Sequence, residues 1–498
     1  MTTPLAGTVP ATGLRLNAGG TGHMLYAPYF TTQAKNSTLL NITNTDMTNG
    51  KAVKVRFRGA ANSDDVLDFT VFLSPGDVWT ASLVQDANGF SNITTTDTSC
   101  TLPTSFGNGV AFKTNRVASY LAADAQAAHT REGYVEVLNM ADIEPNETTG
   151  SLYHSTKHVN GVPRNCNAAI LTSTMLNTTV LADAAAAAGV GLYAPTGGLM
   201  GSWAVMNQEK LAVYGGAMTA VQAVGAGDAN GAAAIVFAPQ VGSPIGAALD
   251  TTATATNGTT GGINGATADP LLHGGYVTPL WFDLPDMSTP LVPAQFAQPQ
   301  TQVLDLAGAL ARTSVINEYV NAAGGAVPME TDWVVSQPTR RYYAAVDYAS
   351  SATAAQIIWN DDMTVTTANA LNDVTTAPAA TANPYAILVK ESNGFGPFAC
   401  LTAGLSTADR EENFTSAAAD FSPGTTSNYC GEVFTLSFGG NSVLNASLSN
   451  TAAEAQGAAG WGQLTLANSA ELPIVGFAAT SMQGATGNYG LTLPYRWN

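Results

Sequence analysis

Residues 36–84 constrain the fold of this chain more than any other stretch, because their apolar and polar side chains alternate. Between residues 53 and 58, valine and phenylalanine alternate with lysine and arginine, which gives a strand one apolar and one basic face. Residues 40–43 alternate before it, and residues 67–73 alternate after it. The pattern predicts three antiparallel strands, with a tight hairpin turn at Asn49-Gly50, because this dipeptide readily takes the positive φ that such a turn requires.

The charges of this stretch balance one another. Four of the chain's 18 lysine and arginine residues fall between residues 51 and 58, and Asp64, Asp65 and Asp68 follow closely. Paired strands bring such residues opposite each other, so we expect cross-strand ion pairs on an exposed face. This interpretation is favoured over a basic site for nucleic acid.

Short alternating segments with glycine, asparagine and proline turns recur along the chain, which is typical of antiparallel sheets. The predicted fold class is therefore all-β, mainly antiparallel β-sandwiches with long loops and one or two short helices. We expect four regions, with sheets free to be shared between them: an extended N-terminal arm at 1–22, a β-sandwich at 23–170, a β-rich region with a low-complexity loop and a helix at 171–330, and a C-terminal β domain at 331–498.

The best helix candidate lies near the end of the third region. Val303, Leu306 and Leu310 recur at helical spacing, and Ile316 and Tyr319 continue the pattern. The sequence therefore predicts one helix that extends over residues 303–320.

Charge limits the partners that suit this chain. Its net charge is −18, and charged residues make up only 11% of it, against about a quarter in average soluble domains. This acidic balance argues against nucleic acid and anionic membranes as partners, and leaves carboxylates able to attract cations. The longest apolar tract, residues 184–194, is far shorter than the ~20 residues that span a bilayer, so we expect no transmembrane segment.

The four cysteines indicate the compartment. Cys100, Cys166, Cys400 and Cys430 make an even number, and no two are close enough for a CxxC metal pair. Of the three possible connectivities we favour the local one, Cys100 with Cys166 and Cys400 with Cys430, in an oxidising compartment. The alternative is four free thiols in a reducing compartment. No export signal is visible at Met1. We therefore expect either that the numbering begins after a signal has been removed or that export uses another route.

Catalytic motifs are missing from the sequence. It has no GxSxG elbow, no HExxH motif, no P-loop and no GxGxxG that opens a helix. His154 and His158 have a spacing that would suit zinc on a helix, but no third ligand lies nearby. We therefore expect no enzymatic activity.

Calcium is the metal that the sequence favours, because clusters of Asp and Asn offer oxygen ligands. The alternative at each cluster is an Asx turn that ends a hairpin. The candidate calcium ligands are Asp64, Asp65, Asp86, Asn88, Asp228, Asn230, Asp361 and Asp362.

Six segments of the chain carry a family resemblance: residues 25–32 (LYAPYFTT), 132–140 (EGYVEVLNM), 158–166 (HVNGVPRNC), 331–343 (TDWVVSQPTRRYY), 472–482 (LPIVGFAATSM) and 489–497 (YGLTLPYRW). They resemble a family of exported, β-rich cell-surface proteins of Gram-negative bacteria. The resemblance spans nearly the whole chain and implies export and a place in a surface layer. No catalytic motif is associated with the family, so the resemblance implies no catalytic residue in this chain.

Together these features predict a structural cell-surface protein that assembles with copies of itself into an extracellular lattice or filament. Its N-terminal arm and exposed sheet edges are the expected contacts, because the arm is too polar to pack alone and edge strands offer unpaired backbone groups. The alternative is a secreted adhesin or glycan-binding β-sandwich protein, with a cell-envelope glycan or lipopolysaccharide as partner.

Overall fold

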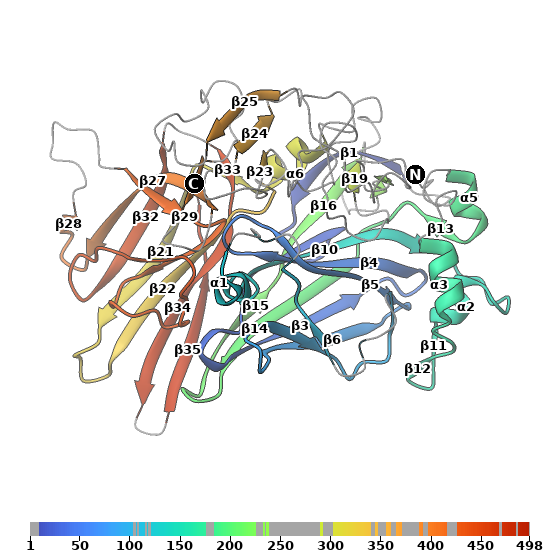
Figure 1. The fold of residues 1–498 in the computed structure, drawn as a ribbon, viewed down its shortest axis with the longest axis horizontal. Coiled ribbons are helices and arrows are strands. Elements are labelled where there is room, and N and C mark those ends of the chain that lie inside the picture. The colour runs from blue at the N-terminus through green and yellow to red at the C-terminus, as the bar shows by residue number, and fades with distance from the viewer. Residues whose placement is uncertain are drawn as a thin grey trace.

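The computed structural model describes residues 9–102, 106, 109–114, 117, 121–175, 184–225, 302–339, 397–415, 426–467, 471–484 and 487–497, and the short strands 233–234, 236–238, 289–291, 344–346, 355–359, 365–370 and 388–391. Within these residues the chain forms two β units that lie side by side (Figure 1). The all-β class that the sequence predicts is confirmed. None of the described helices has the length and apolar character needed to cross a membrane.

The N-terminal unit is a sandwich of two sheets. The nine-stranded sheet has the order β17 (Ala233–Ala234), β1 (Val9–Leu16), β16 (Thr219–Gly225), β2 (Met24–Thr31), β10 (Glu132–Ile143), β4 (Gly50–Gly59), β5 (Asp65–Leu73) and β8 (Cys100–Leu102), with β13 (Leu192–Tyr193) beside β10. The six-stranded sheet has the order β15 (Ala212–Ala217), β14 (Leu199–Asn207), β3 (Asn36–Asn44), β6 (Val78–Gln85), β7 (Ser91–Thr94) and β9 (Val110–Ala111).

The C-terminal unit is built on an eleven-stranded sheet. Its main order is β26 (Leu388–Glu391), β27 (Pro397–Asp409), β32 (Ala459–Leu466), β21 (Ser314–Ala322), β22 (Met329–Ser336), β30 (Val433–Ser437) and β31 (Asn450–Ala452). Beside β27 lie β28 (Phe414–Thr415) and β29 (Ser427–Cys430), and beside β22 lies β34 (Val475–Gly484), which pairs with β35 (Gly487–Pro494).

Smaller elements complete the described chain. The short sheets are β11 (His158–Val159) with β12 (Val162–Pro163), β18 (Val236–Ala238) with β19 (Thr289–Leu291), β20 (Ala311–Arg312) with β33 (Leu472–Pro473), and β23 (Ala344–Val346), β24 (Ala355–Trp359) and β25 (Val365–Ala370). The helices are the 3₁₀ turn η1 (Gln33–Lys35), α1 (Ala123–Ala128), α2 (Leu152–Thr156), α3 (Ala168–Met175), α5 (Ala184–Gly189) and α6 (Gln302–Leu310).

The hairpin expected at Asn49-Gly50 is wrong. The strand before this dipeptide, β3, belongs to the six-stranded sheet, whereas the strand after it, β4, belongs to the nine-stranded sheet. The connection crosses between the layers through a turn in which Asp46 accepts hydrogen bonds from the backbone N–H groups of Thr48 and Asn49. The alternation of both strands is real, because Ile42 and Val55 are both buried in the same core cluster, but it does not say which sheet each strand joins.

The N-terminal arm, where it is described, is part of the protein's own sheet. Residues 9–16 form β1, which pairs antiparallel with β16 from Leu16 opposite Val221 to Ala11 opposite Gly225. Ala11 is 1% exposed, and Leu14 packs against the core. The strand therefore pairs its backbone groups within the protein's own sheet rather than with a neighbour. The first residues of the expected arm, 1–8, lie outside the described part.

The predicted helix begins where expected and ends early. The helix α6 ends at Leu310, and Ser314–Ala322 is the strand β21, paired with β32. Val315 and Tyr319 are 1% exposed and lie on one side of this strand, whereas Ile316, which continued the helical spacing, is half-buried on the other side. Tertiary pairing with β32 decides between the two periods.

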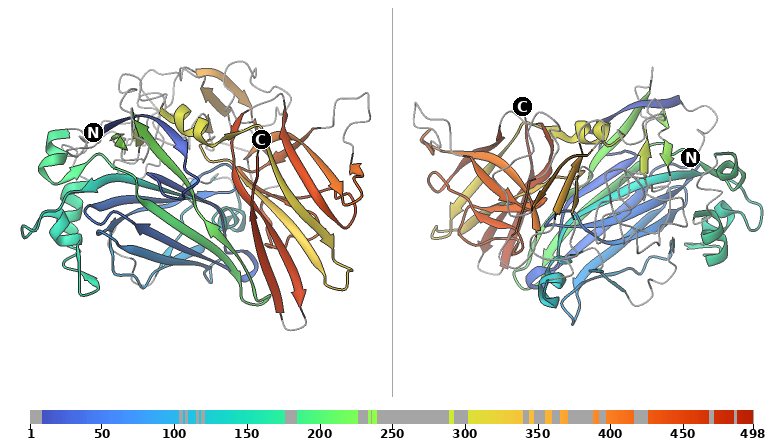
Figure 2. Two further views of the ribbon diagram at one scale, coloured as in Figure 1. Left: turned by 180° about the vertical axis from the view of Figure 1, so that it is seen from behind. Right: turned by 45° about the horizontal axis from the view of Figure 1, so that its top comes forward.

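Sheets are shared across the predicted boundaries at 170 and 330. The strands β14, β15 and β16 of the third region complete the N-terminal sandwich, whereas β21 and β22 on either side of residue 325 belong together in the C-terminal sheet. Two units rather than three regions are therefore seen among the described residues, with α6 between them in the chain (Figure 2).

Of the two clusters of buried apolar residues, one lies within the C-terminal unit and the other extends through both units. The same cluster of buried residues holds Trp203 of β14 and Phe477 of β34, whose ring centroids lie 4.5 Å apart. At the opposite side of the junction, Ser63 donates a hydrogen bond to the Glu432 carboxylate, and the backbone N–H of Ala399 donates to Ala61 O at 3.0 Å. The junction is thus packed and hydrogen-bonded like a protein interior.

Two buried carboxylates hold the loop that follows β30 at this junction. Asp332 of β22 accepts hydrogen bonds from the Ser442 hydroxyl and from Leu444 N, the latter at 3.1 Å. Glu132 of β10 accepts from Ser447 N at 2.9 Å. Residues 442–448 are therefore fixed to a strand of each unit at once.

Candidate interaction face

The six-stranded sheet has an outer side without charge. None of the strands β15, β14, β3, β6, β7 and β9, all of them described, contains a lysine, arginine, aspartate or glutamate. We call the solvent-facing side of this sheet the neutral face. From the strand register its side chains include Val213 and Ala217 of β15, Met200, Ser202, Ala204 and Met206 of β14, Leu39 and Asn41 of β3, Val78, Thr80, Ser82 and Val84 of β6, and Asn92 and Thr94 of β7.

The alternation of each strand produces this face. Along β3, Leu40 and Ile42 point into the core at 2% and 1% exposure, so Leu39 and Asn41 must point outward. Aliphatic side chains on the face are well exposed, from 39% for Val84 to 49% for Val213. The face therefore combines uncharged polar groups with apolar side chains that have not been covered by the protein itself.

A shallow groove of about 720 Å³ crosses the neutral face. It is lined by Leu39, Leu40, Asn41, Thr80, Ala81, Ser82, Thr94, Thr95, Thr96, Gly109, Ser202, Trp203 and Ala204. Its hydroxyl groups are partly used within the sheet, since Ser82 Oγ lies 2.9 Å from Thr94 Oγ1 and Thr95 donates to Thr80 O at 2.6 Å. The lining offers shape and apolar contact rather than an acid, a base or a nucleophile.

The charges that the sequence placed on an exposed face are instead buried in the other sheet. The expected ion pairs exist: Lys54 Nζ lies 3.2 Å from Asp68 Oδ2, and Arg56 Nε lies 3.2 Å from Asp65 Oδ2. However, the side chains of Lys54 and Arg56 are at most 1% exposed. The predicted exposure is wrong because β4 lies between β10 and β5 and all its residues are buried.

This buried ionic layer extends across three strands. Glu136 of β10 lies 3.1 Å from Arg58 Nε, and Asp142 lies 2.8 Å from Lys51 Nζ. A buried charge must be paired, because its desolvation cost is several kcal/mol. Four of the chain's 18 lysine and arginine residues are therefore buried in ion pairs inside the N-terminal unit.

The predicted calcium ligands are found in different surroundings. Asp65 is paired with Arg56, and Asp64 is buried beside it at 4% exposure. Asp86 Oδ1 accepts hydrogen bonds from the backbone N–H groups of Asn88 and Phe90, which is the geometry of an Asx turn between β6 and β7.

The remaining candidates, Asp228, Asn230, Asp361 and Asp362, lie outside the described residues. Within the described residues, no three His, Cys, Asp or Glu side chains are grouped as a metal site would need. Calcium binding stays a prediction.

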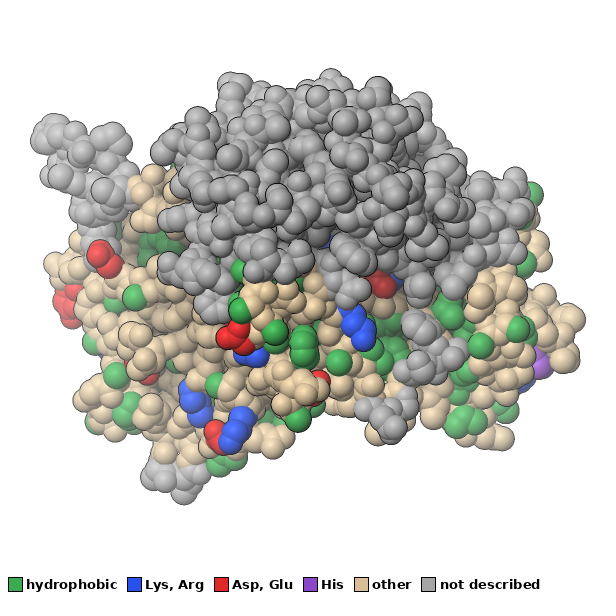
Figure 3. Space-filling view, in the orientation of Figure 1, with side chains coloured by type: hydrophobic (Ala, Val, Ile, Leu, Met, Phe, Trp, Pro, Cys, Tyr) green, Lys and Arg blue, Asp and Glu red, His purple; other side chains and the backbone are tan. Residues whose placement is uncertain are grey.

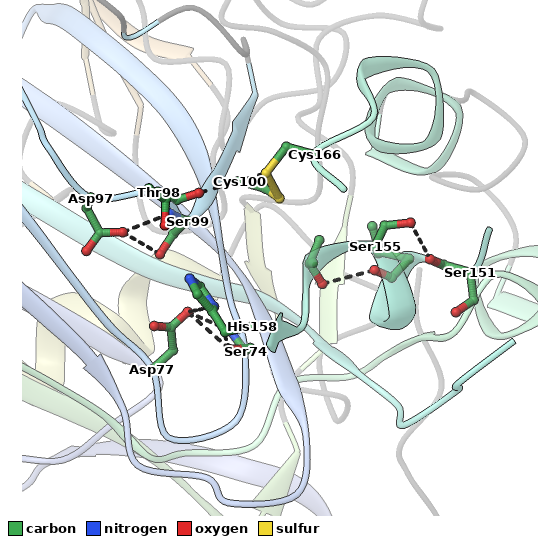
Figure 4. Close-up of a disulfide and its surroundings, with 12 residues drawn as sticks. Ser74, Asp77, Asp97, Thr98, Ser99, Cys100, Ser151, Ser155, His158 and Cys166 are labelled. Carbon is green, nitrogen blue, oxygen red and sulfur yellow. Dashed lines mark hydrogen bonds and ion pairs between the residues drawn. A yellow bond between two sulfur atoms is a disulfide. The ribbon is translucent and has the colours of Figure 1, made fainter. Parts of the chain in front are cut away.

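Two disulfides join the cysteines in the local pairing that the sequence favours, Cys100 with Cys166 and Cys400 with Cys430. The first attaches the segment that carries α2, β11 and β12 to the edge strand β8 (Figure 4). The second joins the neighbouring strands β27 and β29. No free cysteine occurs among the described residues.

A serine, a histidine and an aspartate meet beside the first disulfide, but their geometry is not that of a catalytic triad (Figure 4). Ser74 Oγ lies 2.9 Å from His158 Nδ1, and Asp77 Oδ2 lies 3.1 Å from the same nitrogen. A triad needs the serine and the aspartate on opposite nitrogens of the ring, so that the histidine can transfer a proton between substrate and nucleophile. This cluster anchors the β11–β12 hairpin instead. His154 lies on α2 and does not share a described metal cluster with His158.

The neutral face could be predicted from the sequence only in part. The absence of charge from residues 36–44, 78–85 and 199–207 can be counted, but that these three segments are neighbours cannot. The buried carboxylates Glu132 and Asp332 carried little signal, since Glu132 is the first residue of its strand and Asp332 follows Glu330 and Thr331 in its own.

Comparison of the chain with protein-family models, with curated proteins and with solved structures gives no match in any of the three.

Proposed function

We propose that this protein is an extracellular, non-catalytic structural protein that assembles with copies of itself into a lattice or filament on a cell surface. The observation that carries the proposal is the neutral face. The rest of the chain is acidic, with a net charge of −18, so two copies repel each other except where charge is absent. A charge-free face with exposed aliphatic side chains is where a second copy can approach at the least electrostatic cost.

The composition of the neutral face also fits a contact between proteins. Charged residues are depleted from the cores of protein interfaces, and sheet faces can stack about 10 Å apart. Figure 3 shows one face of the molecule, on which the described charged side chains are few and scattered. Two disulfides support an oxidising environment. The resemblance of six segments to exported cell-surface proteins supports the same assignment.

The test places a charge at the centre of the neutral face. Leu39→Glu and Ser202→Glu alter outward-facing side chains, so the fold should be kept while two opposing copies gain like charges. We expect the parent protein to form ordered assemblies by sedimentation velocity and negative-stain electron microscopy, and both variants to sediment as monomers. Val162→Glu is the matched control, since Val162 is 50% exposed on the separate β11–β12 hairpin; it should assemble like the parent.

The proposal fails if the parent stays monomeric at high concentration with calcium present, or if the two neutral-face variants assemble as the parent does.

A further inference from the structure

The C-terminal unit exposes two aromatic side chains next to each other. Phe414 of β28 is 59% exposed and Trp461 of β32 is 42% exposed. Their ring centroids lie 6.3 Å apart with the ring planes at 90°. We call this pair the aromatic platform. It lies in the other unit from the neutral face, among the strands labelled β27, β28 and β32 in Figure 1.

Strand register places the two rings in one row. Ala408 of β27 is opposite Phe414 on one side and opposite Trp461 on the other, and Glu318 of β21 is the next residue along the row. Cross-strand neighbours share a face of the sheet. Ala408 is small and 1% exposed, so the two rings cover it while remaining open to solvent.

The chain holds Phe414 in position before any ligand arrives. Asp409 Oδ1 accepts hydrogen bonds from Glu411 N and Asn413 N, both at 2.9 Å, and Asp409 Oδ2 accepts from Asn413 Nδ2 at 2.9 Å. These bonds fix the turn that returns the chain from β27 to β28. A platform ordered in this way loses little conformational entropy when it binds.

Hydrogen-bonding groups surround the platform on the same face. Gln463 follows Trp461 by two residues on β32, and Ser406 is opposite Gln463 on β27. Gln463 Nε2 donates a hydrogen bond to Ser314 Oγ at 3.0 Å. The side-chain carbonyl oxygen of Gln463 takes no part in this bond and can accept a hydrogen bond from a ligand. Glu318 forms an ion pair with Arg496, in which Arg496 Nη1 lies 3.3 Å from Glu318 Oε1, and both side chains are exposed.

An apolar ring framed by hydroxyl, amide and carboxylate groups matches the two-sided chemistry of a pyranose. One face of a sugar ring presents C–H groups that pack on an aromatic side chain, and its rim presents hydroxyls that need hydrogen-bond partners. We infer that the aromatic platform binds a neutral polysaccharide, with Trp461 as the stacking surface and Phe414 as the adjoining wall.

Charge selects a neutral polymer and argues against a second copy at this place. The whole chain carries a net charge of −18, and Arg496 is already paired with Glu318. The turn beside Phe414 presents the exposed residues Glu411 and Glu412. An acidic polysaccharide or another acidic copy would meet repulsion here, whereas an uncharged glycan would not.

The test is native affinity electrophoresis of the full chain in gels that contain a soluble β-glucan, an α-mannan or a galactomannan, with alginate as the acidic comparison. We expect at least one neutral polymer to retard the parent. Trp461→Ala should weaken that binding at least tenfold, and Phe414→Ala several-fold. Tyr489→Ala is the matched control, because Tyr489 is 59% exposed on β35, and it should bind as the parent does.

Thermal unfolding of each variant should match the parent, because both rings are exposed. The inference is overturned if no neutral polymer retards the parent, if Trp461→Ala is retarded equally, or if only alginate retards the protein. It is also overturned if Trp461→Ala changes the oligomeric state and leaves retardation unchanged. Leu39→Glu should retain binding, so that loss of assembly and loss of glycan binding are distinguished.

Discussion

At the scale of single residues, Asp332 shows how one buried carboxylate can connect two β units. It is completely buried on β22, and it receives hydrogen bonds from the loop that Glu132 of the other unit also holds. Burial raises the pKa of Asp332 to about 6, although the hydrogen bonds from Ser442, Ser437 and Leu444 offset part of this rise. Burial likewise raises the pKa of Glu132.

Asp332→Asn should therefore change how the free energy of unfolding depends on pH. The pKa of Asp332 is about 6 in the folded protein and 3.8 as its ordinary value, so the folded state binds more protons between these values. Its contribution to stability is then fully present below pH 3.8 and is lost as the pH rises through 6. Asparagine does not titrate. The stability of the parent relative to the variant should be roughly 2 kcal/mol greater at pH 4.5 than at pH 7, measured by denaturant unfolding.

Asp124→Asn, on an exposed helix position, serves as the control and should leave the pH dependence unchanged. An identical pH dependence for the parent and Asp332→Asn would contradict the prediction.

At the scale of elements, the sequence predicts strands better than it predicts their neighbours. Alternation in residues 53–58 identifies β4, and its pairing with β5 follows from proximity in the chain. By contrast, β3 pairs with β14, in which Trp203 lies opposite Leu40. No local signal indicates a partner so far along the chain. Asn49-Gly50 fails as a hairpin signal for the same reason, because the competing partners of both strands lie elsewhere.

The same distinction applies to the sites. Cysteine spacing favours the local disulfide pairing that the structure contains, because the loops involved are short relative to the chain. The burial of Arg56 could not be predicted from the sequence. Alternation shows that a strand has two different sides, but it does not show that one of them faces water. A strand between two others in a large sheet can bury both.

The β11–β12 hairpin should depend on its disulfide. Cys166 is exposed while Cys400 is 1% exposed, so a mild reductant should open the bond between Cys100 and Cys166 first. Replacing both members of this pair by serine should cost about 2–4 kcal/mol of stability. Hydrogen exchange should then rise in residues 151–166, although Ser74 and Asp77 still contact His158, and stay slow in β10.

Equal reduction rates for the two disulfides, or unchanged exchange in residues 151–166, would contradict this expectation. Parent protein under non-reducing conditions is the control.

At the scale of the whole molecule, the charge distribution and the shared core support the same architecture. Ion pairs bury four of the 18 basic residues in the nine-stranded sheet of the N-terminal sandwich, and the strands of its six-stranded sheet contain no charged residue. The other end of that sandwich is closed by the C-terminal unit, where Gly215 N donates to Thr492 Oγ1 at 3.0 Å. The junction fixes the two units relative to each other, and with them the proposed assembly face and the proposed glycan platform.

The two units should consequently unfold together. Phe477→Ala removes a C-terminal ring that packs on Trp203 of the N-terminal unit, and loss of a buried aromatic ring costs about 3–5 kcal/mol. Because one apolar cluster extends through both units, calorimetry should show a single transition for the parent and a single, lower transition for the variant. Leu491→Ala, on the exposed side of β35, is the control and should leave the transition in place. Two transitions, of which Phe477→Ala shifts only one, would mean that each unit folds on its own and that the packed junction does not couple them.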